Sequence, residues 1–393
     1  MDNEKKYTCT LTPLGEYFLG GERTFSWGKP EGTQSSYYIE SNILPSQPTL
    51  FGVIRYIILE TNGLLDDNSR SCQCEVKHDK QNKLIGNCGF IMDENCISNT
   101  AQANKESNYG IISGIGPLYI VEKHEDGKHH KLIPVPLNHK VGHEEKPAYY
   151  TPFKMKKEKV YTDLGEYTIL PEDFEAKNGL AYDCYMDCAD NRIIEGTEIF
   201  QLNEHTRVAV GKKEDGYFKK KYVSMKQGYA FQFEFALTSN ENKYGNINTI
   251  VYLGQEKSAF KVECKRINEE RNISHCIYTA QDDNAGYCVI YLLSDAYVIP
   301  ENINNALYYC TASENIRTLT KISGNAYNSQ KNKYKDSKKK SELFKLYKKG
   351  SVFYIADDKV DDFINGLDIY ELQRIGLNMY IKLLKKKEQE YEK

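Results

Sequence analysis

Seven basic side chains lie within residues 205–226, against only two acidic ones. The segment reads HTRVAVGKKEDGYFKKKYVSMK, in which two β-prone runs flank a turn at Glu214-Asp215-Gly216. This pattern predicts a long β-hairpin with lysines near its tip. Cations that follow phosphates and rings that stack on bases are the chemistry of a site for single-stranded nucleic acid. The basic and aromatic residues of interest are Arg207, Lys212, Lys213, Lys219, Lys220, Lys221, Tyr217, Phe218 and Tyr222.

A histidine near these cations is the main candidate for acid–base chemistry. His205 precedes Arg207 on the same expected strand, where its imidazole could act as the general base of a metal-independent ribonuclease. Alternatively, His205 packs or forms a hydrogen bond at the root of the hairpin and has a structural role. The sequence has no G-x-S-x-G, H-E-x-x-H or Walker motif. We therefore expect no catalytic residues and keep a metal-independent endoribonuclease as the alternative.

Four cysteines form the best candidate metal site of the sequence. Cys72, Cys74, Cys88 and Cys96 are close enough along the chain to offer four thiolates to tetrahedral zinc. The C-x-C pair and the wide second spacing depart from the usual C-x₂₋₄-C pattern, so free thiols in an insertion are the other interpretation. We expect no bound metal and no cofactor.

Composition excludes several classes of protein. The 393 residues carry a net charge of −3, although residues 321–350 hold ten lysines against two acids. The rest of the chain is therefore acidic, and the two basic segments predict either a phosphate-binding surface or solvated loops. No apolar run reaches the ~18 residues of a membrane span, and the start of the chain has no signal-peptide core. The odd number of eleven cysteines favours reduced thiols, so we expect a cytoplasmic protein.

The elements expected around these residues make an α+β chain. Apolar spacing after Pro48 predicts a helix that ends near Gly63, and Gly52 within it is expected to admit a close backbone neighbour. The last 35 residues are compatible with a helix or with a closing strand. Strands are expected at 7–12, 109–121, 131–136, 180–186, 198–202, 229–237, on both sides of Gly254, at 287–293 and at 351–356.

Several motifs in order along the chain resemble the RAMP superfamily of CRISPR RNA-binding subunits. They are similar to those of the Cas-five-like, third subunit of type III-B (Cmr) effector complexes. The paired-glycine G-G-E of that family corresponds here to Gly254-Gln255-Glu256. The other matching segments are Pro13-Leu14 with residues 21–25, residues 45–55, residues 116–118 with 134–137, residues 205–208 and residues 350–354.

The resemblance implies two ferredoxin-like (RRM-like) units with insertions, and the basic hairpin as a thumb. The expected division is residues 1–268 and 269–393. The first unit would carry a cysteine-bearing insertion at about 62–108 and the hairpin at about 205–226. The second would carry a lysine-rich loop at about 321–350.

The resemblance also implies a subunit without catalysis that binds the crRNA 5′ handle. Its protein partners would be the large polymerase/cyclase-like subunit and a RAMP backbone subunit, with no membrane involved. A protein scaffold whose lysines face acidic neighbours is a third interpretation. Lysines 338–340 are a secondary RNA contact or a subunit-facing loop in this hypothesis. The expected RNA-binding residues are Arg23, Arg55, His205, Thr206, Arg207, Lys212, Lys213, Lys219, Lys220, Lys221, Tyr222, Gly254 and Lys257.

Overall fold

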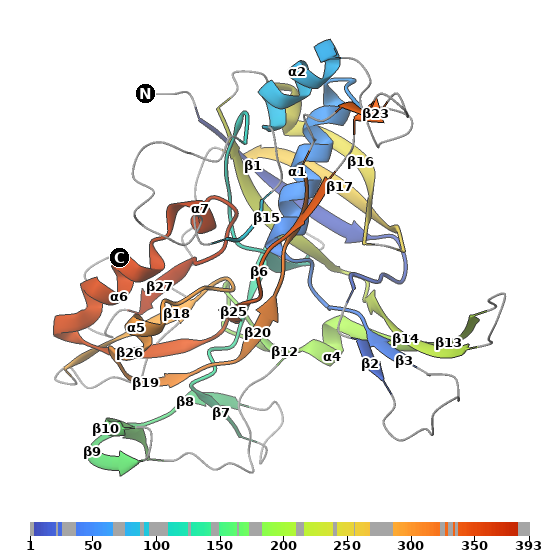
Figure 1. Ribbon diagram of the computed structural model, residues 1–393. Coiled ribbons are helices and arrows are strands. Elements are labelled where there is room, and N and C mark those ends of the chain that lie inside the picture. The colour runs from blue at the N-terminus through green and yellow to red at the C-terminus, as the bar shows by residue number, and fades with distance from the viewer. Residues whose placement is uncertain are drawn as a thin grey trace.

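The computed structural model describes most of the chain. The described residues are 4–20, 23–25, 37–65, 75–86, 90–93, 109–124, 127–142, 149–162, 165–172, 183–209, 216–238, 242–254, 256–267, 286–322, 327–328, 333–334 and 337–383. The fold is α+β and mostly β, with several antiparallel sheets, as the sequence predicts (Figure 1).

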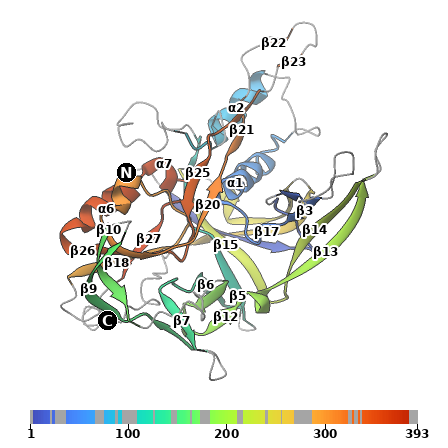
Figure 2. The same ribbon diagram turned by 60° about the horizontal axis from the view of Figure 1, so that its bottom comes forward.

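The largest sheet has nine strands and lies at the centre of the molecule (Figures 1 and 2). Its first strand along the chain, β1 (Lys5–Pro13), pairs antiparallel with β15 on one side and β17 on the other. The remaining order runs from β15 through β5, β6 and β11 to β12, and from β17 to β16, while β4 pairs with β15. The bounds are β4 Ile112–Ile115, β5 Tyr119–Lys123, β6 His129–Pro134, β11 Cys184–Asp187, β12 Ile193–Glu195, β15 Tyr229–Leu237, β16 Asn246–Leu253 and β17 Ser258–Ile267.

Helix α1 (Gln47–Thr61) covers one face of this sheet and confirms the helix expected from apolar spacing (Figure 1). Pro48 lies in its first turn, where a missing N–H is tolerated. Its buried side chains join the core cluster that includes Tyr7, Cys9 and Leu11 of β1. Burial of each aliphatic or aromatic side chain contributes roughly 1.5–3 kcal/mol, which outweighs the weak helix propensity of the β-branched residues. These buried helix residues are Leu50, Phe51, Val53, Ile54, Ile57 and Ile58.

The expectation for Gly52 is wrong within this chain. A Cβ added there would have no atom within 4 Å outside the helix itself, so the glycine lies on the open side of α1. We therefore expect Gly52→Ala to raise the free energy of unfolding by about 0.5–1 kcal/mol, because alanine restricts the unfolded chain and favours the helix. Urea denaturation with an unchanged m-value measures this. A loss of stability would contradict the open environment.

A second, four-stranded sheet contains the basic hairpin, whose two strands the sequence predicts. β13 (Phe200–Ala209) and β14 (Gly216–Met225) pair antiparallel, with Phe200 opposite Met225 and Ala209 opposite Gly216. β3 (Tyr37–Glu40) adds to β14 in parallel, and β2 (Arg23–Phe25) adds to β3. The short helix α4 (Gly196–Ile199) precedes β13. This sheet extends away from the large one in both views (Figures 1 and 2).

The C-terminal residues form a third sheet, in the order β19, β26, β18, β27. Both interpretations of the last 35 residues are partly confirmed, because two helices precede a closing strand. Leu372 and Ile375 are buried in the helical part, and β27 pairs with β18. The bounds are β18 Tyr287–Leu292, α5 Pro300–Ile303, β19 Ala306–Cys310, β26 Val352–Ala356, the 3₁₀ helix Asp357–Lys359, α6 Val360–Leu367, α7 Tyr370–Gln373 and β27 Tyr380–Leu383.

Two-stranded pairs make up the remaining described strands. The lysine-rich segment is expected to be a loop, but parts of it form strands that pair back on residues 313–322. The polar insertion contains a helix, α2 (Glu75–Ile85), and the 3₁₀ helix Asn242–Gly245 precedes β16. The pairs are β7 His139–Gly142 with β8 Tyr149–Pro152, β9 Met155–Thr162 with β10 Gly165–Pro171, β20 Ser313–Ile316 with β25 Phe344–Tyr347, β21 Leu319–Ile322 with β24 Ser337–Lys340, and β22 Tyr327–Asn328 with β23 Lys333–Tyr334.

One hydrophobic cluster joins the N-terminal and C-terminal parts of the chain. It contains buried residues of β1, α1, β15 and β17 together with Phe344, Leu346, Ile369, Leu372 and Ile375. The division at residue 268 stays a prediction. No helix within the described ranges has the length and apolar character of a membrane span.

Candidate nucleic-acid interface

One face of the basic hairpin packs against two loops of the large sheet. We call it the inner face, defined by Asn203 and His205 on β13 and Lys220 and Tyr222 on β14. Register partners lie on the same side of an antiparallel pair, and here Asn203 is opposite Tyr222 and His205 opposite Lys220. His205 Nε2 lies 2.7 Å from Glu16 Oε2, and its ring is perpendicular to the Tyr222 ring at 5.0 Å.

Lysine 220 belongs to this inner face and is largely covered. Its ammonium forms an ion pair with Glu256 and lies 5.2 Å from the centroid of the Phe18 ring. Only 13% of the Lys220 side chain is exposed. Phe18 also packs on Tyr222, with the ring centroids 5.4 Å apart. Lys220 therefore anchors the hairpin to the body of the protein.

Backbone contacts hold the segment Glu16–Leu19 in this position. Tyr17 exchanges two hydrogen bonds with Val223 of β14, with N–O distances of 2.8 and 3.0 Å. On the other side, the Phe18 N–H donates to Ser258 Oγ at 2.9 Å. Gly254 has a φ of +71°, and a Cβ there would lie 2.4 Å from the Phe18 carbonyl oxygen. Gly254 thus permits close approach of the chain's own backbone.

The opposite, outer face of the hairpin carries the more exposed lysines. We define it by Glu204 and Thr206 on β13, Lys219 and Lys221 on β14, and Tyr38 and Glu40 on β3. Lys219 donates to Glu204 at 2.7 Å, and 55% of its side chain is exposed. This hydrogen bond raises the pKa of Lys219 and lowers that of Glu204.

Lys221 is the second lysine of the outer face. Its ammonium lies 5.5 Å from the centroid of the Tyr38 ring and 3.5 Å from Glu40 Oε2. A hydrogen bond from Lys221 to Tyr38, followed by the charge of Glu40, raises the pKa of this lysine. The outer face therefore offers two cations beside an aromatic ring, which suits a phosphate next to an unstacked base.

Carboxylates contact the basic side chains on both faces. Glu16, Glu40, Glu204 and Glu256 pair with His205, Lys221, Lys219 and Lys220 respectively. The more exposed pairs, those of Lys219 and Lys221, contribute about 0–1 kcal/mol each to stability. A phosphate can therefore replace the carboxylate on Lys219 or Lys221 at small cost to the fold. Lys257, exposed and at a φ of +51°, makes no ion pair within the described residues.

The structure brings together part of the predicted RNA-binding set. Arg23 is the register partner of Ile39, which is in turn the partner of Lys220. Lys220 is the partner of His205, so the four residues form one row across the second sheet. Thr206 is exposed beside Lys219. Arg55 lies on a different element, α1, with its guanidinium carbon 5.7 Å from the centroid of the Phe51 ring.

Other predicted residues are described only in part or not at all. Arg207 and lysines 338–340 are placed by the backbone of β13 and β24. Lys212 and Lys213 at the hairpin tip lie outside the described residues, as do Cys72, Cys74, Cys88 and Cys96. Their roles, including the zinc hypothesis, stay predictions.

Sequence reasoning missed the acidic partners of the hairpin. The hairpin register places Glu204 opposite Lys221, so Glu204 could have been found from the predicted turn. Glu16, Glu40 and Glu256 come from three separate segments, and no local pattern points from them to the hairpin. Phe18 and Tyr38 were missed for the same reason.

Part of the chain matches a known protein family. Residues 9–182 match the family described as CRISPR-associated protein (Cas_Cmr3). The resemblance found in the sequence is thereby confirmed. The Cas_Cmr3 match includes Glu16, Phe18, Tyr38 and Glu40, and it ends before the hairpin strands β13 and β14.

Solved structures with similar chains were also found. A chain of the Type III-B Cmr-beta complex bound to cognate target RNA is 12% identical, with a TM-score of 0.41 over 96% of both chains. A chain of the Csm3-Csm4 subcomplex of the type III-A CRISPR-Cas interference complex is 14% identical. Its TM-score is 0.32 over 90% of this chain and 96% of that one. No curated protein matches this chain.

Proposed function

We propose that this protein is a non-catalytic subunit of a type III CRISPR effector complex that holds the crRNA 5′ handle on its hairpin sheet. The observation that carries the proposal is the outer face, where Lys219 and Lys221 lie beside Tyr38 on an extended two-stranded arm. The match of residues 9–182 to the Cas_Cmr3 family supports the type III assignment. The inner face would fix the arm to the body, so that the outer lysines meet the RNA.

The strand orders support two ferredoxin-like units in this proposal. Counting only the strands of the C-terminal sheet along the chain, the spatial order β19-β26-β18-β27 is second, third, first and fourth, with helices after the first and third. In the large sheet, β17, β1, β15 and β5 have the equivalent order. The hairpin β13–β14 would then be the thumb of the first unit, inserted before β15.

The handle proposal predicts a change in salt dependence. Lys219→Ala with Lys221→Ala should weaken binding of an RNA carrying the repeat-derived 5′ end. Two lost phosphate contacts should reduce the log–log salt slope by about 1.4, at about 0.7 per contact for a single strand. Fluorescence anisotropy at several salt concentrations measures both quantities.

Two control variants sharpen this experiment. Glu204→Gln with Glu40→Gln frees the same lysines and should tighten binding. Lys359→Ala removes an exposed lysine, paired with Asp362 at 4.0 Å, from the C-terminal unit and should change nothing. A slope that is the same in the Lys219/Lys221 variant and the parent protein would remove the outer face from the RNA site.

The remaining parts of the proposal have their own tests. Docking of the large polymerase/cyclase-like subunit predicts that the two proteins copurify when coexpressed, and separate elution would contradict it. The endoribonuclease alternative predicts metal-independent cleavage of repeat RNA that disappears in His205→Ala. Because His205 Nε2 is engaged by Glu16, we expect no such cleavage.

A further inference from the structure

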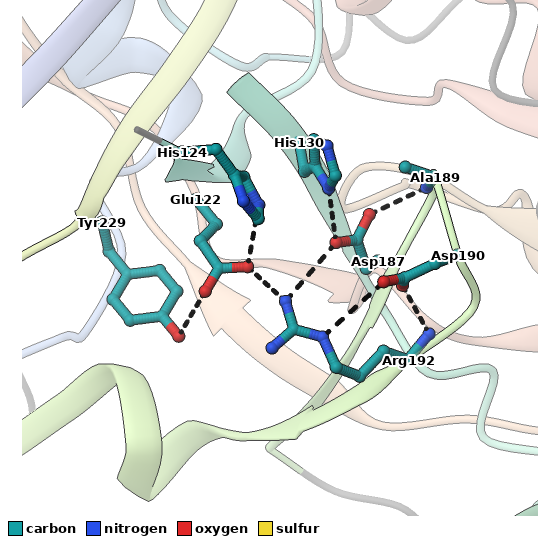
Figure 3. A network of polar contacts seen from close by, with 8 residues as sticks. All are labelled: Glu122, His124, His130, Asp187, Ala189, Asp190, Arg192 and Tyr229. Atoms are coloured by element: carbon teal, nitrogen blue, oxygen red, sulfur yellow. Dashed lines mark hydrogen bonds and ion pairs between the residues drawn. The ribbon is translucent and has the colours of Figure 1, made fainter. Parts of the chain in front are cut away.

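A cluster of histidines and carboxylates lies at the far end of the large sheet from β16, away from the hairpin faces. His124, His130 and Asp187 each offer one ligand atom, and these atoms lie within 4.8 Å of one another (Figure 3). His130 is the second residue of β6, close to the turn of the β5–β6 hairpin, and Glu122 of β5 is its register partner. Asp187 is the last residue of the neighbouring strand β11. Three adjacent segments therefore bring imidazole and carboxylate groups to one point.

Asp187 is positioned as a fixed acceptor in this cluster. Its side chain is 0% exposed, and its Oδ1 accepts a hydrogen bond from the Ala189 N–H at 2.8 Å. Its Oδ2 lies 2.9 Å from His130 Nδ1. A buried carboxylate requires compensation by hydrogen bonds or positive charge. Asp187 therefore faces the cluster with one oxygen held by the backbone and the other directed at His130.

His124 has an unsatisfied nitrogen that faces the same point. Its Nε2 is a buried atom without a hydrogen-bond partner, 3.4 Å from Glu122 Oε2. The rings of His124 and His130 are close, with centroids 4.0 Å apart. A buried ring nitrogen without a partner carries a desolvation cost that a bound cation would remove. His124 therefore offers the cluster a ring nitrogen that no hydrogen bond holds in place.

Arg192 lies between the two carboxylates. Its Nη2 contacts Glu122 Oε2 and lies 3.7 Å from Asp187 Oδ2 (Figure 3). The Arg192 side chain is 47% exposed, and its Nε is 3.9 Å from Asp190 Oδ2. The guanidinium can therefore turn toward Asp190 and solvent, which would leave Glu122 and Asp187 available to another cation.

We propose that His124, His130 and Asp187 bind a divalent transition-metal cation of the zinc type, with Glu122 as the fourth ligand and Arg192 displaced. Mixed nitrogen and oxygen donors suit tetrahedral Zn²⁺, with ligand bonds of about 2.0–2.2 Å. At the tetrahedral angle such donors lie about 3.4 Å apart. Reaching this arrangement from donors already within 4.8 Å requires only side-chain adjustment. The site differs from the cysteine cluster, which shares none of its residues.

Titration of the full-length protein with Co²⁺, and competition with Zn²⁺, tests the site. The visible absorption of tetrahedral Co²⁺ reports binding, and thiolate bands identify any cobalt bound by cysteines. His130→Gln and, independently, His124→Gln should weaken this binding by about 100-fold or more. His129→Gln is the matched control, because this neighbour faces Gln232 at 3.2 Å and should bind as the parent does.

Arg192→Ala should strengthen Co²⁺ binding, whereas the histidine variants should weaken it. Removing the competing positive charge should tighten Co²⁺ binding by about tenfold, whereas a purely structural network would lose stability without gaining affinity. Circular dichroism confirms that each variant is folded. Equal Co²⁺ affinity in the parent and in either histidine variant would overturn the proposal. The proposal would also be overturned if the Arg192→Ala variant bound Co²⁺ no more tightly than the parent protein.

Discussion

Gly254→Val should destabilise the protein by about 3 kcal/mol and separate Phe18 from the inner face of the hairpin. Gly254 has a φ of +71°, a conformation that costs a residue with a Cβ about 1–2 kcal/mol and a β-branched residue more. The added Cβ would also lie 2.4 Å from the Phe18 carbonyl oxygen. Because that atom belongs to the backbone, it cannot rotate away as a side chain would.

Chemical denaturation and RNA binding together measure this effect. Gly228→Val is the matched control, since Gly228 has a φ of +94° but no atom within 4 Å of an added Cβ. The control should lose only the conformational cost and keep RNA affinity. Gly254→Val should lose more stability and also weaken RNA binding, because the Glu16–Leu19 segment supports the hairpin. Equal losses in the two variants would mean that the approach of Phe18 to Gly254 has no energetic importance.

Arg374→Ala should lower the free energy of unfolding by about 3 kcal/mol, because the C-terminal helices would lose contacts with the large sheet. The guanidinium donates to the backbone carbonyls of Ser113 at 3.3 Å and Ile112 at 3.2 Å. It also lies 4.5 Å from the centroid of the Tyr109 ring. Hydrogen bonds from a charged donor are worth about 1.5–3 kcal/mol, and the Arg374 side chain is only 12% exposed.

Arg374→Lys separates charge from geometry in this test. Lysine keeps the positive charge near Glu371 but cannot reproduce the planar arrangement of the guanidinium over Tyr109, so we expect an intermediate loss. Thermal unfolding and limited proteolysis between β26 and β27 provide the measurements. Parent-like stability in Arg374→Ala would contradict a role in joining the two parts of the chain.

Local patterns in the sequence were sufficient for the elements that have one apolar face. α1 and the hairpin strands follow from periodicity and turn residues, because these signals depend only on near neighbours. α2 was missed because its sequence, EVKHDKQNKLI, is almost entirely polar. Gly52 was misinterpreted, since sequence alone cannot distinguish a glycine beside another backbone from one that faces open space.

Residues of the candidate sites that come from distant segments could not be grouped from local sequence patterns. The lysines of the hairpin could be selected because they are consecutive, but the carboxylates that pair with Lys220 and Lys221 come from segments outside the hairpin. The cluster of His124, His130 and Asp187 was not selected at all. His124 and Asp187 are more than sixty residues apart, and the pairing of β5 with β6 and of β6 with β11 brings them together.

The hydrophobic cluster shared by both parts of the chain has a consequence for synthesis on the ribosome. The strands β1, β15 and β17 are complete at residue 267, yet their core also contains Ile369, Leu372, Ile375 and Leu377. At a translation rate of about 5–20 residues per second, these side chains are made on the order of 10 s later. During that interval the nascent sheet exposes an apolar surface. We therefore expect the growing chain to need protection by a chaperone until its C-terminal helices are made.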